Sequence, residues 1–328
     1  MKYNVPISFI VPVYNVANYL AQCLDSIIMQ SVDKEIIIID DGSTDASLFI
    51  AEQYAQKYSY IKVLKQKNAG ASGARNMGIR ASCGKYVIFI DSDDYLFENA
   101  IGDLCQLCEA KNLDMLQFRY IEYFEQQGEY IPRPMRQVLL RDGEVYSAGD
   151  YFYKVRKQHE FDAMVWLRIY RRDFIIQNNL FFAEGVIFED LLYTLQSLTV
   201  NPRARITEID KAIYVYRRRK SSVMTSYTVL EYINTTFCIY QKMLAYAFEN
   251  TFSEPLQHTI YQYIYTRIIR IIAASRDLSK NECVGVYSML TGDILKNTLR
   301  YRSDWKDYRR VCRFWLKKYW FTIRHGCD

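Results

Sequence analysis

Glu35-Ile36-Ile37-Ile38-Ile39-Asp40 is the stretch of this sequence that decides the fold. Every interior position is isoleucine, a β-branched residue that favours extended structure. A strand that faces water on one side alternates apolar and polar residues, and this segment does not alternate. An uninterrupted apolar strand is typical of a parallel sheet that helices cover on both faces. The segment therefore predicts an α/β fold.

The neighbouring segments repeat a unit of one strand and one helix. Ile7–Val13 is an apolar run, and helical spacing follows it at Leu20, Cys23, Leu24, Ile27 and Ile28. Beyond residue 40 we expect a helix over about 46–58, a strand over 61–64, a third helix and a strand over 86–90. This alternation predicts a doubly wound, mostly parallel, Rossmann-like sheet with right-handed crossovers. Ligands of such sheets bind beyond the carboxyl ends of the strands.

Composition excludes several classes of protein. The net charge of +5 over 328 residues is too small to indicate nucleic-acid binding. The eight cysteines are irregularly spaced, and the Cys105-x-x-Cys108 pair has no second pair with which to bind zinc. We expect free thiols in a reducing cytoplasm. No stretch reaches the roughly 18–20 consecutive apolar residues that span a bilayer.

Polar residues gather where three of the predicted strands end. They lie at Pro12–Asn15, Asp40–Asp45 and Asp91–Asp94. A carboxylate in the second cluster can accept a hydrogen bond from a nucleobase N–H, and Tyr14 offers a ring on which a base can stack. Ser43 or Thr44 can equally cap the helix that follows.

Asp91-Ser92-Asp93-Asp94 directly follows an apolar strand. Ionised carboxylates are not buried unpaired, so the cluster must face water or meet a cation. Aspartates flanking a small residue can present oxygens to one hard divalent ion. The alternative is an acidic turn in which Asp93 or Asp94 caps the next helix.

The third predicted helix begins in the glycine-rich stretch Asn68–Gly78. Its small residues permit close approach of a ligand, and Arg75 can bind phosphate or base with two N–H groups. The dinucleotide fingerprint G-x-G-x-x-G does not follow the first strand, and the sequence contains no G-x-x-x-x-G-K-[ST] loop. Hydride transfer and NTP hydrolysis are therefore disfavoured.

Four motifs together resemble family 2 glycosyltransferases, inverting enzymes of the GT-A fold and here of the bacterial surface-polysaccharide type. They are VPVYN at 11–15, IDDGSTD at 39–45, NAGASGARNMGI at 68–79 and FIDSDDYL at 89–96. They occur in the family's order and cover roughly residues 5–125. The resemblance implies a nucleotide-sugar donor, a divalent metal ion (Mn²⁺ or Mg²⁺) and inversion at the anomeric carbon.

The resemblance also implies which residues bind the nucleotide and which bind the metal ion. The nucleotide-binding residues would be Pro12, Tyr14, Asn15, Asp40, Asp41, Arg75 and Asp91, with Asp41 reading the base. Asp93 would be the principal metal ligand, with Asp91 beside it. Asp94 would be a metal ligand, a support for one, or a cap.

A second acidic pair follows at Glu189-Asp190, and by resemblance Asp190 is the catalytic base with Glu189 in support. An inverting displacement needs one carboxylate to deprotonate the acceptor hydroxyl. The pair also favours the N-terminus of the apolar helix that follows it, and the two roles are compatible.

Trp166 begins a segment similar to W-x-K-L-Y in relatives, with Arg168 where lysine is common. Trp166 can stack on a sugar ring or pack in the core. The contacts of Arg168 stay open at this stage.

The C-terminal third of the sequence contains a basic loop, a predicted helix and a basic, aromatic tail. Tyr214–Val223 reads as a strand and a basic loop that can close over a diphosphate or remain a solvated turn. Residues 260–274 predict a packed helix. Residues 297–324 combine basic and aromatic residues, a composition that suits helices lying on anionic membranes. A partner-binding helix and a helix covering the core are the alternatives.

We therefore expect a GT-A catalytic domain over residues 1–225 and a helical region over 226–328. Residues 1–125 would bind the nucleotide-sugar and 126–225 the acceptor. The expected enzyme is an inverting, metal-dependent glycosyltransferase at the cytoplasmic face of the cell membrane. It would use a UDP-sugar and a saccharide acceptor carried by a lipid, and it would not bind nucleic acid. A GT-A-like nucleotidyltransferase and a non-catalytic nucleotide-sugar-binding protein are the alternatives.

Overall fold

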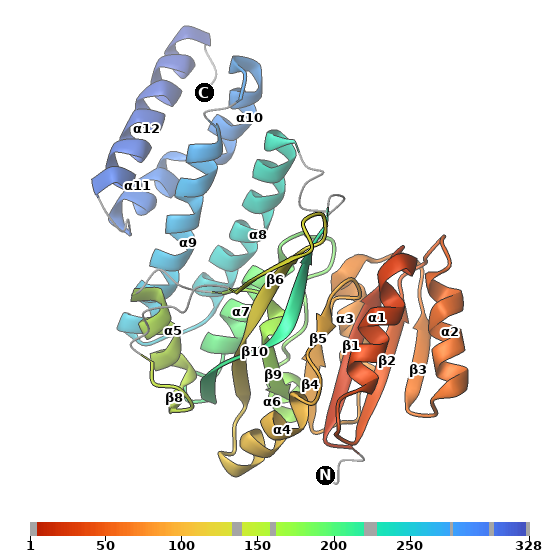
Figure 1. The fold of residues 1–328 in the computed structure, drawn as a ribbon. Helices are drawn as coiled ribbons and strands as arrows, with labels where there is room; N and C mark the ends of the chain where they lie inside the picture. Colours follow the sequence, from red (N-terminus) through yellow and green to blue (C-terminus); the bar gives the residue numbers. More distant parts are fainter. Residues whose placement is uncertain are drawn as a thin grey trace. The chain divides into compact units, whose positions relative to one another are not determined.

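The structure is a computed structural model, and it describes residues 5–132, 140–157, 162–219, 228–275, 278–301 and 305–325. The chain divides into two compact units, which Figure 1 shows in sequence colours. Unit 1 comprises Met1–Gly185 and Glu189–Lys220, and unit 2 comprises Val186–Phe188 and Ser221–Asp328. Parts of two predicted segments, residues 220–223 of the basic loop and 302–304 of the tail, lie outside the described residues.

Within the described residues of unit 1, ten strands form one sheet. Eight of them follow the order β3-β2-β1-β4-β9-β6-β10-β5, while β7 pairs with β6 and β8 with β10. The strands are β1 (Ile7–Val13), β2 (Lys34–Asp40), β3 (Ile61–Lys65), β4 (Tyr86–Phe89), β5 (Tyr95–Leu96), β6 (Met115–Phe124), β7 (Glu129–Pro132), β8 (Val145–Ser147), β9 (Arg168–Arg171) and β10 (Arg205–Arg218).

The N-terminal half of the sheet is the predicted parallel arrangement. Strands β3, β2, β1 and β4 are mutually parallel, and the helices α1 (Ala17–Ile28), α2 (Ser47–Lys57) and α3 (Gly70–Ala81) connect them. Helices α1 and α2 contact each other, and α3 packs on β1 and β2. A Cβ on Gly78 would lie 2.3 Å from Ile10 Cγ2, so the close approach of α3 to the sheet requires glycine there. The predicted α/β core is confirmed.

The other half of the sheet is mixed. Strand β9 is antiparallel to β4 and β6, while β10 is parallel to β6 and antiparallel to β5. The remaining helices of this unit are α4 (Ile101–Ala110), α5 (Ala148–Lys157), α6 (Arg172–Gln177) and α7 (Glu189–Thr199), with a short 3₁₀ helix η1 (Val165–Leu167). Strand β5 and not a helix follows the acidic cluster, because α4 begins only at Ile101. The alternative that Asp93 or Asp94 caps the next helix is therefore wrong.

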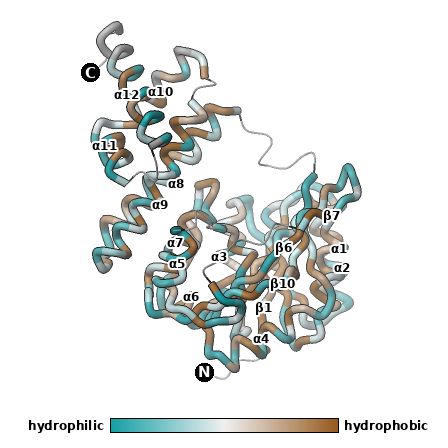
Figure 2. The backbone as a smooth tube through the Cα atoms, turned by 60° about the vertical axis from the view of Figure 1, so that its left-hand side comes forward, coloured by the Kyte–Doolittle hydropathy of each residue, from teal (hydrophilic) through white to brown (hydrophobic). Residues whose placement is uncertain are grey.

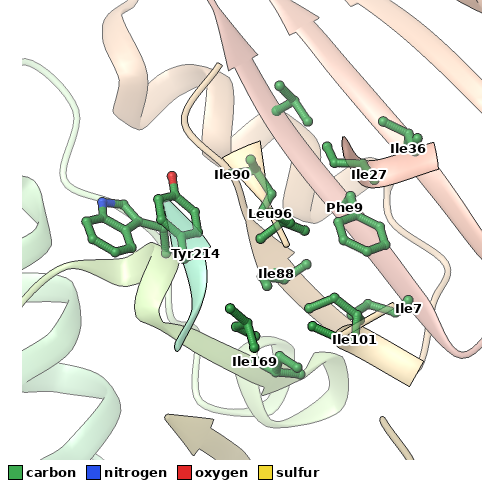
Figure 3. Close-up of a cluster of buried hydrophobic side chains, with 14 of the residues drawn as sticks. Ile7, Phe9, Ile27, Ile36, Ile88, Ile90, Leu96, Ile101, Ile169 and Tyr214 are labelled. Carbon is green, nitrogen blue, oxygen red and sulfur yellow. The ribbon is translucent and has the colours of Figure 1, made fainter. Parts of the chain in front are cut away.

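A hydrophobic cluster fills the space between the sheet and its helices. Ile7 and Phe9 of β1, Ile27 of α1, Ile88 of β4 and Tyr214 of β10 all belong to it (Figure 3). All five side chains are fully buried. Because this cluster includes residues from both halves of the sheet, it fixes β10 relative to the parallel strands.

Unit 2 is helical in its described residues. Its helices are α8 (Val229–Glu249), α9 (Glu254–Ala274), α10 (Lys280–Met289), α11 (Gly292–Arg300) and α12 (Trp305–His325). Thr228 and Glu231 form a capping box at the start of α8. Hydrophobic and hydrophilic residues alternate along α8 and α9 (Figure 2), as expected of helices with one packed face. Among the described helices, none combines the length and hydrophobicity that crossing a bilayer requires.

Helix α12 contains most of the predicted basic tail. It packs on α9 and α11, and its residues Val311 and Phe314 are buried. Trp315, Leu316 and Tyr319 are 38%, 60% and 60% exposed. The tail therefore has one face that covers the core of unit 2 and another that carries large apolar side chains into solvent.

Candidate functional site

The loops after β1 and β2 meet through the side chain of Asn15. Asn15 Oδ1 accepts hydrogen bonds from the backbone N–H groups of Thr44 (2.8 Å) and Asp45 (3.3 Å), and the Asn15 N–H donates to Ser43 Oγ (3.2 Å). Asn15 has a φ of 52°, in a region that asparagine tolerates better than most residues. The prediction that Ser43 or Thr44 caps the next helix is wrong, because Asp45 Oδ1 accepts from the Ser47 N–H (2.9 Å) at the start of α2.

Tyr14 and Pro12 stand next to this junction. Tyr14 is 48% exposed, and Pro12 is half-buried. The role of these two residues in a base pocket stays a prediction.

Asp40 and Asp41 are equally buried but differ in their hydrogen bonds. Both oxygens of Asp41 are engaged: Oδ1 accepts from Gln66 Nε2 and the Ala69 N–H (2.7 Å each), and Oδ2 accepts from the Gly70 N–H (2.8 Å). Asp41 therefore satisfies the first N–H groups of α3. Asp40 is equally buried, and its Oδ1 has no hydrogen-bond partner among the described residues. Asp41, to which the family resemblance assigns base reading, thus has both oxygens engaged by the protein, whereas Asp40 Oδ1 is a buried acceptor without a partner among the described residues.

The three aspartates after β4 also differ. Asp94 is buried, its Oδ2 accepts from the Tyr214 hydroxyl and its Oδ1 from the Arg217 N–H, both at 2.7 Å. Burial, with Asp93 and Asp91 nearby, raises the pKa of Asp94 well above its usual value. In this structure Asp94 ties the acidic loop to β10.

Asp91 and Asp93 remain accessible, with 26% and 23% of their side chains exposed. Asp93 Oδ2 lies 2.7 Å from Arg219 Nη2, and the Asp93 carbonyl accepts from Arg217 Nε (2.8 Å). Burial raises the pKa of Asp93, and Asp91 adds to this effect while Arg219 opposes it. Sequence reasoning gave the basic loop a possible role over a diphosphate but did not match Arg217 or Arg219 with Asp93. The signal was a run of cations at the end of a buried strand.

Arg75 links the two acidic clusters. Its Nη2 lies 2.9 Å from Asp91 Oδ1, and its Nη1 lies 2.5 Å from Glu189 Oε1 and 3.4 Å from Asp190 Oδ1. The guanidinium is buried and lies over the Phe182 ring, 5.3 Å from its centroid. Burial alone would lower the pKa of Arg75, but the three carboxylates raise it.

The segment before Glu189 is held by the residue next to Arg75. Asn76 Oδ1 accepts from the Phe182 N–H (2.8 Å), and Asn76 Nδ2 donates to the Phe182 carbonyl (2.9 Å). The Phe182 ring stacks on Tyr193 of α7, with centroids 4.0 Å apart. Phe188, directly before the acidic pair, has a φ of 63°, which is strained for a bulky residue.

Asp190 lies in the first turn of α7. Its Oδ2 accepts from the Val165 N–H (3.3 Å). Burial raises the pKa of Asp190 to about 7, with Glu189 and Asp91 adding to the effect and Arg75 opposing it. A carboxylate with a pKa near neutrality can accept a proton and release it again, as a general base must.

Trp166 is not exposed. It is 3% exposed and stacks on Tyr214, with centroids 4.2 Å apart and planes 13° apart. It also meets the edge of Tyr120. Of the two readings that the sequence left open, core packing fits this structure and stacking on a sugar does not.

The acidic loop can bind a hard divalent cation only if a substrate supplies further oxygen ligands. In the described part of the chain, no group of three or more His, Cys, Asp or Glu side chains could hold a metal ion. Asp91 and Asp93 supply two accessible carboxylates. Mg²⁺ and similar ions commonly bind one or two carboxylates together with substrate phosphates and water. The residues present therefore fit Mn²⁺ or Mg²⁺ bound with a nucleoside diphosphate.

Comparison with known proteins gives consistent results. The sequence profile described as "Glycosyl transferase family 2" matches residues 8–177. The chain is 36% identical to YibD of Escherichia coli K12 and 33% identical to EpsJ of Bacillus subtilis 168, each described as an uncharacterized glycosyltransferase. Both alignments run over 221 residues and cover 66% of this chain. The chain spans 62% of the length of each relative.

A solved structure has the same fold. Staphylococcus aureus TarS 1–349, in complex with UDP-GlcNAc, superposes with a TM-score of 0.71 over 89% of this chain and 81% of that one. The sequence identity of the pair is 23%, so the likeness concerns the fold alone. It confirms the expected GT-A-type architecture with a helical C-terminal part.

Proposed function

Because the chain belongs to glycosyltransferase family 2, we propose that it transfers a sugar from a nucleotide-sugar to a hydroxyl of a saccharide acceptor, with inversion at the anomeric carbon. The observation that supports this most directly is the contact of Arg75 with both Asp91 and Asp190. It brings the nucleotide-side carboxylate and the candidate base, 99 positions apart, to opposite ends of one guanidinium.

Asp190 is the base in this proposal. It takes the proton of the acceptor hydroxyl while that oxygen attacks the anomeric carbon, and the bond between this carbon and the diphosphate oxygen breaks. The raised pKa of Asp190 supports the role, as does its place in the first turn of α7. Arg75, which also pairs with Glu189, holds its orientation. No covalent intermediate on the protein is needed.

The leaving diphosphate requires positive charge. Asp91 and Asp93 would hold Mn²⁺ or Mg²⁺, which when bound neutralises the departing phosphate oxygens. Arg219, now paired with Asp93, is close enough to this loop to pair with phosphate when the metal takes the carboxylate.

The donor is a UDP-sugar in this proposal. Asp40 Oδ1, a buried acceptor without a partner among the described residues, would accept from the imide N–H of uracil, and the exposed ring of Tyr14 would stack on the base. The fold neighbour from S. aureus was crystallised with UDP-GlcNAc, which makes UDP-sugars the first donors to test.

The acceptor is proposed to be a lipid-linked saccharide in the synthesis of a bacterial surface polysaccharide. The supporting feature is the exposed face of α12, on which Trp315, Leu316 and Tyr319 lie among the exposed Arg313 and Lys317. Helices of this composition lie in the headgroup plane of anionic membranes. The enzyme would act as a peripheral protein at the cytoplasmic face.

A thermal-shift screen of nucleotide-sugars, with and without Mn²⁺, tests the donor proposal. A ligand that binds only the folded protein raises its Tm, so the donor should stand out. A shift with a UDP-sugar that grows with Mn²⁺ is expected, and the absence of any Mn²⁺-dependent shift would contradict the metal proposal. Incubation with NTP and sugar phosphates distinguishes a nucleotidyltransferase. Donor binding without release of nucleoside diphosphate, for any acceptor, would indicate a non-catalytic protein.

A further inference from the structure

Arg168, the first residue of β9, is a fully buried arginine. Its Nη1 donates to the Met164 carbonyl (3.1 Å), and its Nη2 donates to the Asp162 carbonyl (2.7 Å). Removing a guanidinium from water is costly unless hydrogen bonds replace its hydration. The forked contact with two main-chain carbonyls therefore fixes the segment 162–164.

The fixed segment also touches α7 at two points. Thr194 Oγ1 donates to the Ala163 carbonyl (2.7 Å). The next backbone N–H after Met164, that of Val165, donates to Asp190 Oδ2 (3.3 Å). Three consecutive carbonyls are thus engaged just before the N–H group that reaches the candidate base.

We propose that Arg168 is a positioning residue for Asp190, acting through the Met164 carbonyl and the Val165 N–H. The inference rests on the proposed function of Asp190 as the base. Arg168 does not touch the base itself and is not a catalytic residue. Its role is to hold one donor at the oxygen that Arg75 does not contact, since Arg75 lies against Oδ1 and Val165 against Oδ2.

The guanidinium fork explains why arginine suits this position. Two donors in one rigid plane reach carbonyls two residues apart, whereas the ammonium of lysine is a point donor on a flexible stem. Arg168→Lys should therefore keep the buried charge and lose the simultaneous hydrogen bonds to both carbonyls. The Val165 N–H would then be less well placed against Asp190.

Several charged groups face Asp190. Arg75 of α3 and the Val165 N–H lower its pKa, while Glu189 of α7 and Asp91 after β4 raise it. Weakening the Val165 hydrogen bond removes one stabilising contact of the carboxylate. The pKa of Asp190 should rise, and the ascending limb of the pH–rate profile should move to higher pH with it.

The test compares Arg168→Lys and Thr194→Val with the wild-type protein. We expect kcat for sugar transfer to fall about tenfold in Arg168→Lys, the ascending limb to move up by about 0.5 pH unit, and donor affinity by calorimetry to stay unchanged. Thr194→Val should move the limb in the same direction and by less. The proposal would be overturned if the ascending limb of the pH–rate profile did not move in a folded Arg168→Lys protein. It would also be overturned if donor affinity fell as much as kcat.

Arg171→Lys is the matched control. Arg171 ends the same strand and donates to the Leu113 carbonyl (2.6 Å) and to Asp114, with 17% of its side chain exposed. The same change at Arg171 should lower stability without moving the pH limb. An equal movement of the limb in Arg171→Lys would show that any loosening of β9 suffices.

A measurement that does not depend on enzymatic turnover separates this inference from the proposed function. In protein labelled with ¹³C at aspartate carboxyls, the Asp190 resonance is identified by its loss in Asp190→Asn, and it can be titrated directly. A higher Asp190 pKa in Arg168→Lys supports the positioning role even if no donor is turned over. An unchanged pKa contradicts it even if transfer is observed.

Discussion

Arg75 Nη1 lies 3.4 Å from Asp190 Oδ1, while Nη2 of the same guanidinium lies 2.9 Å from Asp91 Oδ1. One buried cation therefore connects the loop after β4 with the start of α7. The planar guanidinium holds the two carboxylates on separate nitrogens of one rigid plane, whereas an ammonium group offers a single nitrogen on a flexible stem. This bridge places a candidate metal ligand and a candidate base in one site.

Asp190→Asn should abolish sugar transfer and leave donor affinity within about twofold, because the amide cannot accept the acceptor proton while the nucleotide pocket is unchanged. Transfer measured with labelled donor, beside calorimetry of donor binding, tests this. Asp103→Asn, an exposed position on α4, is the control and should alter neither quantity. Near-normal transfer by Asp190→Asn would refute the assignment of the base.

The transfer rate should depend on pH through Asp190. Burial first, then Glu189 and Asp91, raise its pKa to about 7. Since the base acts only when ionised, kcat/KM should fall about tenfold per pH unit below that value and level off above it. A profile that is flat between pH 5 and 8 would show that another group takes the proton.

Arg75→Met should lower the free energy of unfolding by about 3 kcal/mol, because it leaves three carboxylates without their shared cation. Urea denaturation measures the loss. Arg80→Met is the control on the same helix: Arg80 is exposed and lies over the Phe181 ring, so we expect a loss below about 1 kcal/mol. Equal losses for the two variants would mean that the buried bridge adds nothing to stability.

Tyr214→Phe should lower the free energy of unfolding by about 2 kcal/mol, since it removes the hydroxyl that donates to the buried Asp94. The control is Tyr86→Phe. Tyr86 is as deeply buried, and its hydroxyl has no partner among the described residues, so its removal should change stability little. Denaturation of both variants decides whether the contact with Asp94 stabilises the acidic loop.

Replacing Trp315, Leu316 and Tyr319 with serine should reduce binding to vesicles that contain phosphatidylglycerol and spare turnover of a soluble acceptor analogue. Co-sedimentation with the vesicles measures binding. Phe49→Ser removes an aromatic side chain that is 63% exposed on α2, and it should not reduce binding. Undiminished binding by the triple variant would contradict membrane contact through α12.

The sequence allowed the parallel half of the sheet to be predicted because its cause is local. Short apolar runs of β-branched residues such as Ile36–Ile39 favour strands buried on both faces, and short helices separate them. Polar residues that follow such strands must lie at one edge, so Asp40 and Asp91 could be placed there. These inferences need only the order of neighbouring segments.

The rest of the site depends on contacts between distant segments. Arg75 meets Glu189 114 positions later, and Asp94 meets Tyr214 120 positions later. No spacing rule in one sequence predicts such pairs. For the same reason Trp166 could not be assigned between core and surface, and Arg219 could not be matched with Asp93.

Phe188 limits where hybrid proteins can be joined when unit 1 of one relative is combined with the helical unit of another. Its ring meets Tyr232 of α8 at 5.7 Å, and Val186–Phe188 group with unit 2, although Glu189 begins the next segment of unit 1. A hybrid protein that joins a foreign helical unit only after residue 220 would keep this three-residue segment from the original parent. The left-handed backbone at Phe188 would then lose the ring contact that accompanies it. Hybrid enzymes should therefore take residues 186–188 from the same parent as the helices.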